Sequence, residues 1–572
     1  MLGLMQDWPL LCHRVIDHAA INHAGRCVHS RSVEGPIETT TYGAIRARAL
    51  KVAQRLDRDG IRLGDRVSTL GWNTARHLEA WYGIMGIGAV YHTVNPRLFP
   101  DQIAWIINHA EPRVLLTDLT FLPLLEQLAD KLGSIERYVV LTDAAHMPAT
   151  ALRNAVPYEQ WIGEVDGDFA WKSFDENTAA GLCYTSGTTG NPKGVVYSHR
   201  SNVLQAMAIA WTDVFGICCR DVVMPVVPMF HANGWSLALT APMIGASLVM
   251  PGPKLDGASV LELLTKYRVT CTAAVPTVWL ALLQHLEAHQ LEAQNRETQN
   301  RETQNLETYG GKLPDLRRVV IGGAACPRAI VKTFQEIYGV EVVHAWGMTE
   351  MSPLGTVCTL KPEYAGRAGE ERLDIQAKQG HAPFTVELKI TDDAGAQLAR
   401  DGKTSGALKV RGPAVARAYF KQDGSILDAE GFFDTGDVAT IDPAGYMQIT
   451  DRAKDVIKSG GEWISSIELE NLAVGHPKVA EAAVIGVRHP KWDERPLLVV
   501  VLKPGQSAGK AEILDFMRPK TASWWLPDDI VFVTEIPHTA TGKIQKTALR
   551  EQFRDYVLPT AAAPAPAHLS RP

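Results

Sequence analysis

The sequence predicts an α/β protein: a large N-terminal domain of mainly parallel sheets covered by helices, followed by a small α+β domain. Three observations predict this. At 572 residues the chain is too long for a single hydrophobic core. Between residues 43 and 117 short apolar strands alternate with helical segments, a pattern typical of parallel sheets covered on both faces. The composition shifts near residues 450–452, where a second domain is expected to begin.

The elements of the first domain follow from periodicity and from the residues that end each segment. Residues 43–60 have the apolar spacing of a helix, which we expect to stop at Gly60. The same criteria predict further helices over 75–83 and 101–110, and strands over 67–70, 89–93, 113–117 and 179–183.

The pattern of the C-terminal part predicts a small α+β domain of roughly a hundred residues. Helices are expected over 466–473 and 511–517, and strands over 482–487 and 497–502. We therefore divide the chain into domains at 1–450 and 451–558. The Pro- and Ala-rich stretch 559–572 is expected to be a disordered tail.

Residues 222–253 lack Asp, Glu, Lys and Arg, and are long enough to span a bilayer. Five prolines interrupt this segment, and His231 and Asn233 lie in its middle. We expect buried strands and a helix around a pocket rather than a membrane span. The N-terminus also lacks the basic start and the long apolar run of a signal peptide.

Charge and cysteine usage narrow the class of protein. A net charge of −6 gives no basic footprint, so no nucleic-acid partner is expected. Eight cysteines without Cys-x-x-Cys spacing indicate buried, reduced thiols in a cytoplasmic protein. The motifs Gly-x-Gly-x-x-Gly, Gly-x-Ser-x-Gly and His-Glu-x-x-His are absent, which leaves hydride transfer, nucleophile-elbow hydrolysis and zinc proteolysis unsupported.

Residues 294–308 repeat one pentad three times, as Gln-Asn-Arg/Leu-Glu-Thr. Three short copies cannot build a solenoid, and a period of five does not align an apolar helical face. The repeat is expected to be a solvated extension of a helix over 278–289, or a mobile loop, without a function.

One loop combines small, hydroxyl-bearing and basic residues without any acid. It reads Tyr184-Thr-Ser-Gly-Thr-Thr-Gly-Asn-Pro-Lys-Gly194. Glycines let backbone N–H groups approach an anion, hydroxyls add neutral donors and Lys193 adds a cation, so the loop predicts a phosphate-binding site. It is not a Walker loop, because Pro192 precedes the lysine and Gly194 follows it. A surface loop without a ligand is the alternative.

Five further stretches accompany this loop in order: residues 228–235, 344–350, 433–437, 451–462 and 539–543. Together the six motifs resemble those of the adenylate-forming superfamily of acyl-CoA synthetases, luciferases and peptide-synthetase adenylation domains. The resemblance covers about residues 15–555. His-Ala-Asn-Gly-Trp at 231–235 and Lys-Ser-Gly-Gly-Glu-Trp-Ile-Ser at 458–465 are most similar to the fatty-acyl-CoA synthetases, with the 3-methylmercaptopropionate-CoA ligases as a near branch.

The resemblance implies a two-step reaction. A carboxylate attacks the α-phosphorus of ATP to give an acyl-adenylate and pyrophosphate, and the thiol of coenzyme A then displaces AMP. Two anions meet in the first step, so positive charge is needed between them. The family's bridging lysine corresponds to Lys543; a surface lysine after a turn is the alternative.

The resemblance also implies the nucleotide site. Glu350 corresponds to the Mg²⁺ ligand, with the hydroxyl of Thr185 as its partner; a helix-capping glutamate is the alternative. Trp346 stands where the family usually has a tyrosine that stacks on adenine, and a core tryptophan is its alternative. Asp437 is expected to accept both ribose hydroxyls, with Arg452 nearby. The full expected set for ATP or AMP is Thr185, Ser186, Gly187, Thr188, Thr189, Gly190, Lys193, Gly323, His344, Ala345, Trp346, Gly347, Thr349, Asp437, Arg452 and Lys454.

Gly323 is expected to pack its bare backbone against the adenine, with a tight turn as the alternative. His231 and Trp235 are expected at the acyl pocket, the tryptophan as a gate and His231 beside the carboxylate as a catalytic group together with Lys543 and Glu350. A buried histidine with its hydrogen bonds satisfied is the rival interpretation of His231.

The family's small domain rotates between the two steps, and Asp451 corresponds to its hinge. Rotation brings a further stretch to the coenzyme A channel, and the residues expected there are Lys458, Ser459, Gly460, Gly461, Glu462 and Trp463.

We therefore expect an ATP- and Mg²⁺-dependent fatty acid–CoA ligase that is a cytoplasmic homodimer. Alternatives are a ligase for 3-methylmercaptopropionate or another short acid, an adenylating enzyme that acylates a carrier-protein phosphopantetheine, and a nucleotide-binding sensor that has lost catalysis.

Overall fold

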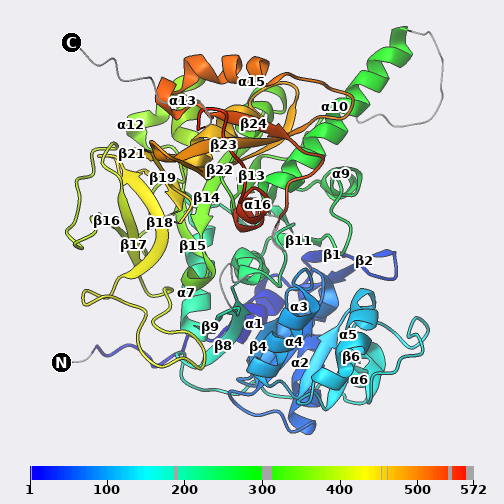
Figure 1. Cartoon of the computed structure of the whole chain (residues 1–572). Helices are drawn as coiled ribbons and strands as arrows, with labels where there is room; N and C mark the ends of the chain where they lie inside the picture. The colour runs from blue at the N-terminus through cyan, green and yellow to red at the C-terminus, as the bar shows by residue number, and fades with distance from the viewer. Residues whose placement is uncertain are drawn as a thin grey trace, which may run out of the picture.

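The structure, a computed structural model, describes residues 1, 3–185, 191–298, 312–452, 454–459, 462–538 and 544–561; within these ranges, the side chains of residues 289–298, 462 and 463 are not described. The large N-terminal domain contains two mainly parallel sheets and one antiparallel sheet, and a smaller C-terminal domain contains a fourth sheet (Figure 1). The fold class predicted from the sequence is confirmed, apart from the antiparallel sheet, which no pattern had indicated.

The seven-stranded sheet has the order β7-β6-β5-β3-β4-β8-β9. All neighbours are parallel except β8 and β9, which form an antiparallel hairpin. Its strands are β3 (Arg66–Leu70), β4 (Val90–Thr93), β5 (Val114–Thr117), β6 (Arg137–Val140), β7 (Ala155–Pro157), β8 (Ala179–Tyr184) and β9 (Gly194–Ser198).

The eight-stranded sheet has the order β15-β14-β13-β12-β10-β11-β1-β2, and only its two outer pairs are antiparallel. Its strands are β1 (Cys27–Arg31), β2 (Ile37–Thr41), β10 (Val222–Pro225), β11 (Ser247–Met250), β12 (Cys271–Ala274), β13 (Arg318–Ile321), β14 (Glu341–Gly347) and β15 (Leu354–Val357).

Helices cover both faces of both sheets. One apolar cluster joins strands of the two sheets through α1 (His13–Asn22), α2 (Tyr42–Arg58), α3 (Ala75–Gly86), α6 (Tyr158–Gly163), α7 (His199–Ala210) and α8 (Leu237–Ile244). The outer face of the seven-stranded sheet packs on α4 (Pro100–Ala110) and α5 (Leu122–Leu128). The outer face of the eight-stranded sheet packs on α9 (Gly257–Lys266), α10 (Pro276–Thr298), α11 (Arg328–Lys332) and α13 (Gly369–Gln376). These layers bury the continuous apolar strands, as parallel sheets require.

Several helices start at side-chain caps that the sequence supplies. Thr41 accepts the backbone N–H of Ala44 at the start of α2, and Asp256 accepts that of Ser259 at the start of α9. Such a cap satisfies one of the N–H groups that the first turn leaves free.

The uncharged segment 222–253 forms β10, a short helical turn (η3, Ala232–Ser236), α8 and β11, as predicted. Across the described residues no helix is long and apolar enough to cross a membrane. The first copy of the pentad repeat continues α10 to Thr298, and the rest of it lies outside the described residues.

The antiparallel sheet β16-β17-β18-β19 connects the two domains. Its strands are β16 (Glu387–Thr391), β17 (Gly406–Arg411), β18 (Phe433–Ile441) and β19 (Met447–Arg452), and α12 (Pro362–Ala365) precedes it. Because β19 ends at Arg452, the chain passes from this sheet directly into the C-terminal domain.

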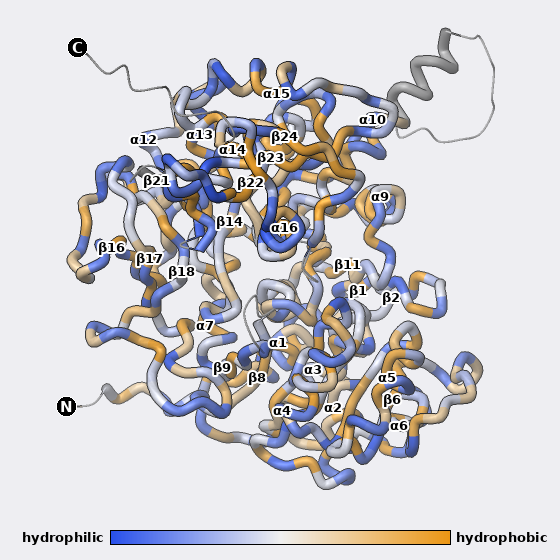
Figure 2. The backbone as a smooth tube through the Cα atoms, viewed as in Figure 1, coloured by the Kyte–Doolittle hydropathy of each residue, from blue (hydrophilic) through white to orange (hydrophobic). Residues whose placement is uncertain are grey.

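The C-terminal domain is built on a five-stranded sheet in which β24 pairs in parallel with β23. Its elements are β20 (Ile457–Ser459), β21 (Glu462–Ile464), α14 (Ser466–Val474), β22 (Val479–His489), β23 (Asp493–Leu502), α15 (Lys510–Met517), β24 (Asp529–Phe532) and α16 (Lys546–Gln552). Apolar residues run along β22 and β23, where they form cores on both faces of the sheet (Figure 2).

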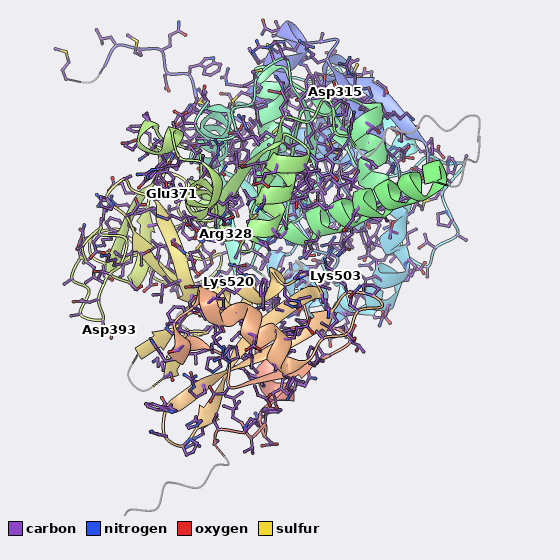
Figure 3. The ribbon with its side chains drawn as sticks, turned by 90° about the horizontal axis from the view of Figure 1, so that it is seen from above. Asp315, Arg328, Glu371, Asp393, Lys503 and Lys520 are labelled. Carbon is purple, nitrogen blue, oxygen red and sulfur yellow. The ribbon has the colours of Figure 1, made fainter. Side chains whose placement is uncertain are left out.

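Seen from above, the C-terminal domain lies against the N-terminal one (Figure 3). Labelled charged residues come from both domains, with Arg328 and Glu371 on one side and Lys503 and Lys520 on the other. All eight cysteines are free thiols, and five of them are buried, in line with the prediction of reduced cysteines. The predicted tail is described only to Ala561.

Candidate active site

A cavity of about 950 Å³ lies between the two domains. The N-terminal domain contributes the β8–β9 hairpin, η3, the start of α10, β14, β18 and β19. The C-terminal domain contributes α14, the start of β22 and the start of α16. The cavity therefore opens where the ends of several strands meet, as is usual in α/β proteins.

Most of the residues predicted for the nucleotide and the acid line this cavity. They are Thr185, Lys193, His231, Trp235, Gly323, His344, Ala345, Trp346, Gly347, Thr349, Glu350, Asp437, Asp451, Arg452 and Lys454. Ser186, Gly187, Thr188, Thr189, Gly190, Gly460, Gly461 and Lys543 lie outside the described residues, as do the side chains of Glu462 and Trp463.

The two ends of the predicted phosphate loop are held together by a hairpin. Thr185 N–H donates to Lys193 O at 2.9 Å, and Lys193 N–H donates to Thr185 Oγ1 at 3.2 Å. The ammonium of Lys193 lies 4.8 Å from the ring centroid of Tyr419, which is a cation–π distance. The loop thus leaves and returns at one point of the cavity wall, with a cation at its end.

Glu350 is buried, with 6% of its surface exposed, yet it lines the cavity. The Tyr419 hydroxyl donates to Glu350 Oε1 at 2.8 Å, and Ala416 N–H donates to the Glu350 carbonyl. Burial and the adjacent carboxylate raise the pKa of Tyr419, so its hydroxyl stays a donor. Tyr419 thus links Glu350 with Lys193, a connection that no sequence motif had indicated.

Both oxygens of the Asp437 carboxylate are in contact with neighbouring side chains. Arg452 Nε lies 2.6 Å from Oδ1, and the indole N–H of Trp346 donates to Oδ2 at 3.1 Å. Strand register explains the first contact, because Asp437 and Arg452 are opposite partners in β18 and β19. Trp346 is 8% exposed and lines the cavity, so its ring offers a flat wall while its N–H orients Asp437.

His344, which was predicted at the nucleotide, lines the cavity, and its ring is bonded within the protein. Its ring is buried, and Nδ1–H donates to Ala377 O at 3.0 Å. Burial lowers the pKa of His344 to about 4, so the imidazole is neutral at physiological pH. Its side chain packs as a core histidine at the cavity wall.

Residues 232–236 form a run of left-handed backbone. The φ angles of Asn233, Gly234 and Trp235 are +43°, +55° and +51°, and both flanking residues are also positive. Such a conformation costs a non-glycine residue about 1–2 kcal/mol. Asn233 Nδ2 donates to Tyr91 Oη at 2.8 Å, and this buried contact helps to hold the strained turn.

The turn brings Trp235 against the glycine pair Gly322–Gly323, which follows β13. A Cβ atom at Gly322 would lie 3.0 Å from the Trp235 ring, so only glycine leaves space for it. Gly323 has a φ of +79° and also lines the cavity. In this structure it is therefore the indole of Trp235 that approaches the bare backbone predicted to contact adenine. His231, half-buried, lies at the start of the turn.

An apolar part of the cavity, which the sequence analysis missed, is lined by Ile209, Phe215, Pro276, Leu280 and Leu354. Phe215 is held by its backbone: its N–H donates to Ile209 O at 3.2 Å, and its carbonyl accepts Arg318 Nη1 at 2.5 Å. These residues lie in ordinary apolar segments, so only their position in the fold identifies them.

Two neighbouring residues of β19 bond to different domains. Asp451 Oδ2 accepts the N–H and the hydroxyl of Ser466 in the C-terminal domain, at 2.7 and 2.8 Å. Arg452 instead pairs with Asp437 in the N-terminal domain. Burial raises the pKa of Asp451 and lowers that of Lys454, which lies just beyond the strand.

The described part of the predicted coenzyme A stretch lies away from the cavity lining. Lys458 N–H donates to Glu494 Oε2 at 3.0 Å, and Ser459 Oγ accepts Arg495 Nη1 at 3.2 Å. Both residues lie in β20, and neither is among the described residues that line the cavity.

The two residues predicted to hold Mg²⁺, Glu350 and Thr185, both line the cavity, and Glu350 presents a buried carboxylate there. Within the described ranges no group of three or more His, Cys, Asp or Glu side chains could hold a metal. This donor set fits Mg²⁺, which proteins bind through one or two carboxylates with substrate phosphates and water.

Comparison with known proteins now identifies the class. Residues 17–420 match the AMP-binding enzyme family, and residues 468–543 match the C-terminal domain of AMP-binding enzymes. The chain therefore belongs to the AMP-binding, adenylate-forming family, as the six motifs predicted.

Relatives narrow the class further. The chain is 48% identical to the 3-methylmercaptopropionyl-CoA ligase of Ruegeria lacuscaerulensis, over 97% of this chain and 99% of that protein. It is 44% identical to a medium-chain-fatty-acid–CoA ligase of Ectopseudomonas oleovorans, over 98% of this chain and 100% of the relative. A long-chain-fatty-acid–CoA ligase of Thermus thermophilus is 42% identical, over 96% of this chain and 97% of the relative.

The crystal structure of the anthranilate CoA ligase AuaEII in complex with anthranoyl-AMP superposes with a TM-score of 0.81 at 26% identity, covering 96% of this chain and 99% of that one. Within its family the protein is an acyl-CoA ligase, an AMP-forming acid–thiol ligase that uses ATP and coenzyme A.

Proposed function

We propose that the enzyme activates a fatty acid as its acyl-adenylate and transfers the acyl group to coenzyme A. The observation that carries this proposal is that one cavity is lined both by polar residues, with Lys193, Glu350 and Asp437 among them, and by the apolar residues described above. We take the polar lining as one end of the cavity and the apolar lining as the other. The polar end suits a nucleotide, and the apolar end suits an uncharged aliphatic chain. A carboxylate at the junction would lie near His231 and Trp235.

In the proposed first step Asp437 accepts the ribose hydroxyls and Trp346 provides a face for adenine. Lys193, with the loop that it closes, contacts the phosphates, as backbone N–H groups and a cation suit an anion. Lys543 is assigned the bridge between carboxylate and α-phosphate on the strength of the family resemblance. Its positive charge would stabilise the charge that develops as the two anions approach.

Mg²⁺ belongs to the proposal as well. Glu350 and Thr185 would hold it, and the ion would neutralise phosphate charge during displacement of pyrophosphate. Tyr419 keeps Glu350 oriented by the 2.8 Å hydrogen bond.

We also propose the division into domains at 1–450 and 451–558, with Asp451 as the hinge between them. In the second step the stretch 458–463 would border the pantetheine channel after the C-terminal domain has rotated. A cytoplasmic homodimer remains part of the proposal and is tested by gel filtration with light scattering.

The second candidate substrate is 3-methylmercaptopropionate, which is favoured by the 48% identity to the Ruegeria enzyme. The test is pyrophosphate release with saturating ATP across straight-chain acids from propionate to palmitate, with 3-methylmercaptopropionate in the same series. A maximum among the fatty acids supports the first proposal, and a maximum at the thioether acid supports the second.

Two controls separate the remaining alternatives. Omission of coenzyme A stalls AMP release if the thiol is the acceptor, whereas an enzyme specific for a carrier protein shows no AMP release when free coenzyme A is supplied. Failure to exchange labelled pyrophosphate into ATP with any of the tested acids would point to a non-catalytic nucleotide-binding protein.

A further inference from the structure

An ion pair at the side of the cavity takes no part in the chemistry described so far. His538 Nε2 lies 2.5 Å from Glu481 Oε1, and the two side chains are 30% and 29% exposed. Glu481 lies near the start of β22, and His538 follows β24 by six residues. Both residues line the large cavity. The pair therefore joins the wall of the cavity to a segment that arrives from another part of the domain.

That segment forms a narrow neck. His538 and Ile544 are antiparallel bridge partners, and Gln545 N–H donates to Pro537 O at 2.8 Å. The chain thus departs at His538 and returns at Ile544, which also lines the cavity. The five intervening residues, 539–543, lie outside the described part of the structure and include Lys543. A contact that holds the neck in place therefore also holds His538 and Ile544, the residues on either side of this stretch.

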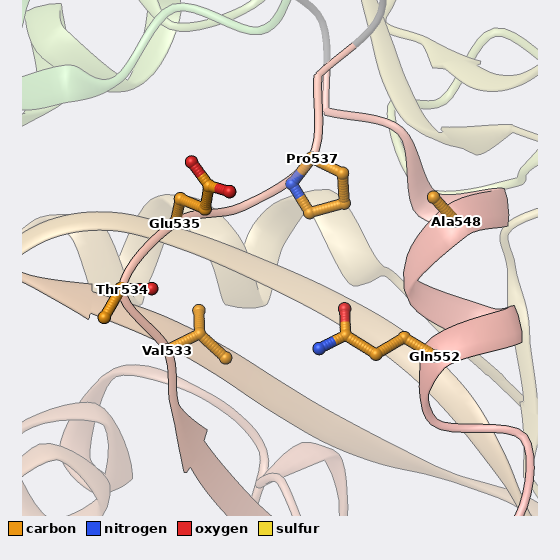
Figure 4. A pocket seen from close by; sticks show the side chains of 6 residues that line it. All are labelled: Val533, Thr534, Glu535, Pro537, Ala548 and Gln552. Atoms are coloured by element: carbon orange, nitrogen blue, oxygen red, sulfur yellow. The ribbon is translucent and has the colours of Figure 1, made fainter.

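One face of the neck borders a surface hollow. The hollow has a volume of about 410 Å³ and lies between residues 533–537 and α16 (Figure 4). Its lining is Val533, Thr534, Glu535, Pro537, Ala548 and Gln552. Ile536 is buried in the core beside it and anchors the segment by apolar contact. The bond between His538 and Glu481 adds a polar contact that fastens the neck to β22.

We propose that His538 and Glu481 are a positioning pair for adenylation: they tie the neck to β22 and so hold His538 and Ile544, the residues on either side of the stretch that contains Lys543, at the cavity. This inference rests on the proposed function, in which Lys543 acts in the first step. A half-buried ion pair with a direct hydrogen bond suits this role, since it is directional as well as attractive.

The charged groups around the neck make the pair depend on pH. Glu481 faces His538 from β22, while Glu470 on α14 and Lys546 on α16 neutralise each other at 2.8 Å. Glu535 lies three residues earlier on the same segment as His538. The hydrogen bond to Glu481, followed by its charge, raises the pKa of His538 above the ordinary value of about 6.5.

Because the pKa of His538 is raised, the ion pair responds to pH in a definite direction. The ion pair exists while the imidazole is protonated, so its charge is present below the raised pKa and is lost as pH rises through it; the neutral ring then keeps at most a weaker, uncharged hydrogen bond to Glu481. Adenylation is therefore expected to fall on the alkaline side of the profile. Replacing His538 by lysine keeps a cation to much higher pH, because the ordinary pKa of lysine is about 10.4.

The experiment measures single-turnover pyrophosphate release against pH, and thioester formation from supplied acyl-AMP. The proteins are the wild type, His538→Lys, His538→Gln and Glu481→Gln. We expect His538→Gln to slow adenylation by about five- to tenfold and to spare thioester formation. His538→Lys should restore the rate and remove the alkaline fall, and Glu481→Gln should move that fall to lower pH.

A matched control is His146→Lys, because His146 pairs with Asp143 at 2.9 Å but does not line the cavity. Its profile should equal that of the wild type. The inference is overturned if His538→Lys keeps the wild-type alkaline fall, or if His538→Gln slows both half-reactions equally. If His538→Gln does not fold, the lysine variant alone decides. Absence of pyrophosphate release by the wild type with every acid would instead refute the proposed function.

Discussion

Asp437→Asn tests the nucleotide site most directly. Asp437 is 1% exposed, and its two oxygens contact Arg452 and Trp346 at 2.6 and 3.1 Å. A carboxylate held in this way can accept two ribose hydroxyls, whereas asparagine presents only one oxygen. Losing one hydrogen bond to a charged acceptor costs about 1.5–3 kcal/mol. The KM for ATP should therefore rise by about 10- to 150-fold.

The free energy of unfolding should change much less in Asp437→Asn than the KM for ATP does. Arg452 is 40% exposed, so its pair with Asp437 is screened by water and contributes about 1 kcal/mol or less. The Trp346 N–H can still donate to the oxygen of the amide. A large rise in the KM for ATP with a small change in melting temperature would therefore indicate a binding role.

The assay is the initial rate of pyrophosphate release against ATP concentration at saturating acid. Asp442→Asn is a matched control, because Asp442 is a buried carboxylate just beyond the same strand, paired with Lys378 at 2.8 Å and absent from the cavity lining. Its KM for ATP should not change. A wild-type KM for Asp437→Asn would refute the assignment of Asp437 to the ribose.

Three further changes test other parts of the site. Lys543→Ala should nearly abolish adenylation while thioester formation from supplied acyl-AMP continues; equal loss of both half-reactions, measured separately, would contradict the division of labour between the two steps. Tyr419→Phe removes the hydrogen bond to the Glu350 carboxylate, worth about 1.5–3 kcal/mol, so the Mg²⁺ concentration for half-maximal rate should rise by about tenfold or more; an unchanged Mg²⁺ titration would separate Tyr419 from the metal. Phe215→Ala should raise the relative kcat/KM for longer acids by about tenfold or more, as pocket space for each methylene is worth about 1–3 kcal/mol; an unaltered chain-length series would place the end of the acyl chain elsewhere.

The alternation of strands and helices was readable from the sequence because parallel sheets bury both faces. The helix predicted over 75–83 forms α3, and the strand over 497–502 forms most of β23. The antiparallel sheet β16–β19 was missed: β17 alternates buried with partly buried residues instead of forming a continuous apolar run, and the long connection from β17 to β18 carries no helical period to mark the sheet.

At the site, Glu350, Asp437 and Trp346 could be named in advance because each lies in a short motif of distinctive composition. Tyr419 and Phe215 could not, since they lie in ordinary stretches and reach the cavity only through tertiary packing. Burial explains why His344, correctly placed in its motif, is a neutral core side chain. The sequence shows which residue types occur together in a motif, whereas tertiary packing determines which of their atoms a ligand can reach.

The opposite attachments of Asp451 and Arg452 limit how the two halves can separate. The side chain of Asp451 bonds to Ser466 and that of Arg452 to Asp437, so the two domains meet within a few residues of β19. In the proposed rotation the change would therefore fall on a few backbone dihedral angles near these residues. The hydrogen bond to Ser466 and the ion pair with Asp437 would resist that change, which makes these two contacts part of what holds the two domains in this arrangement.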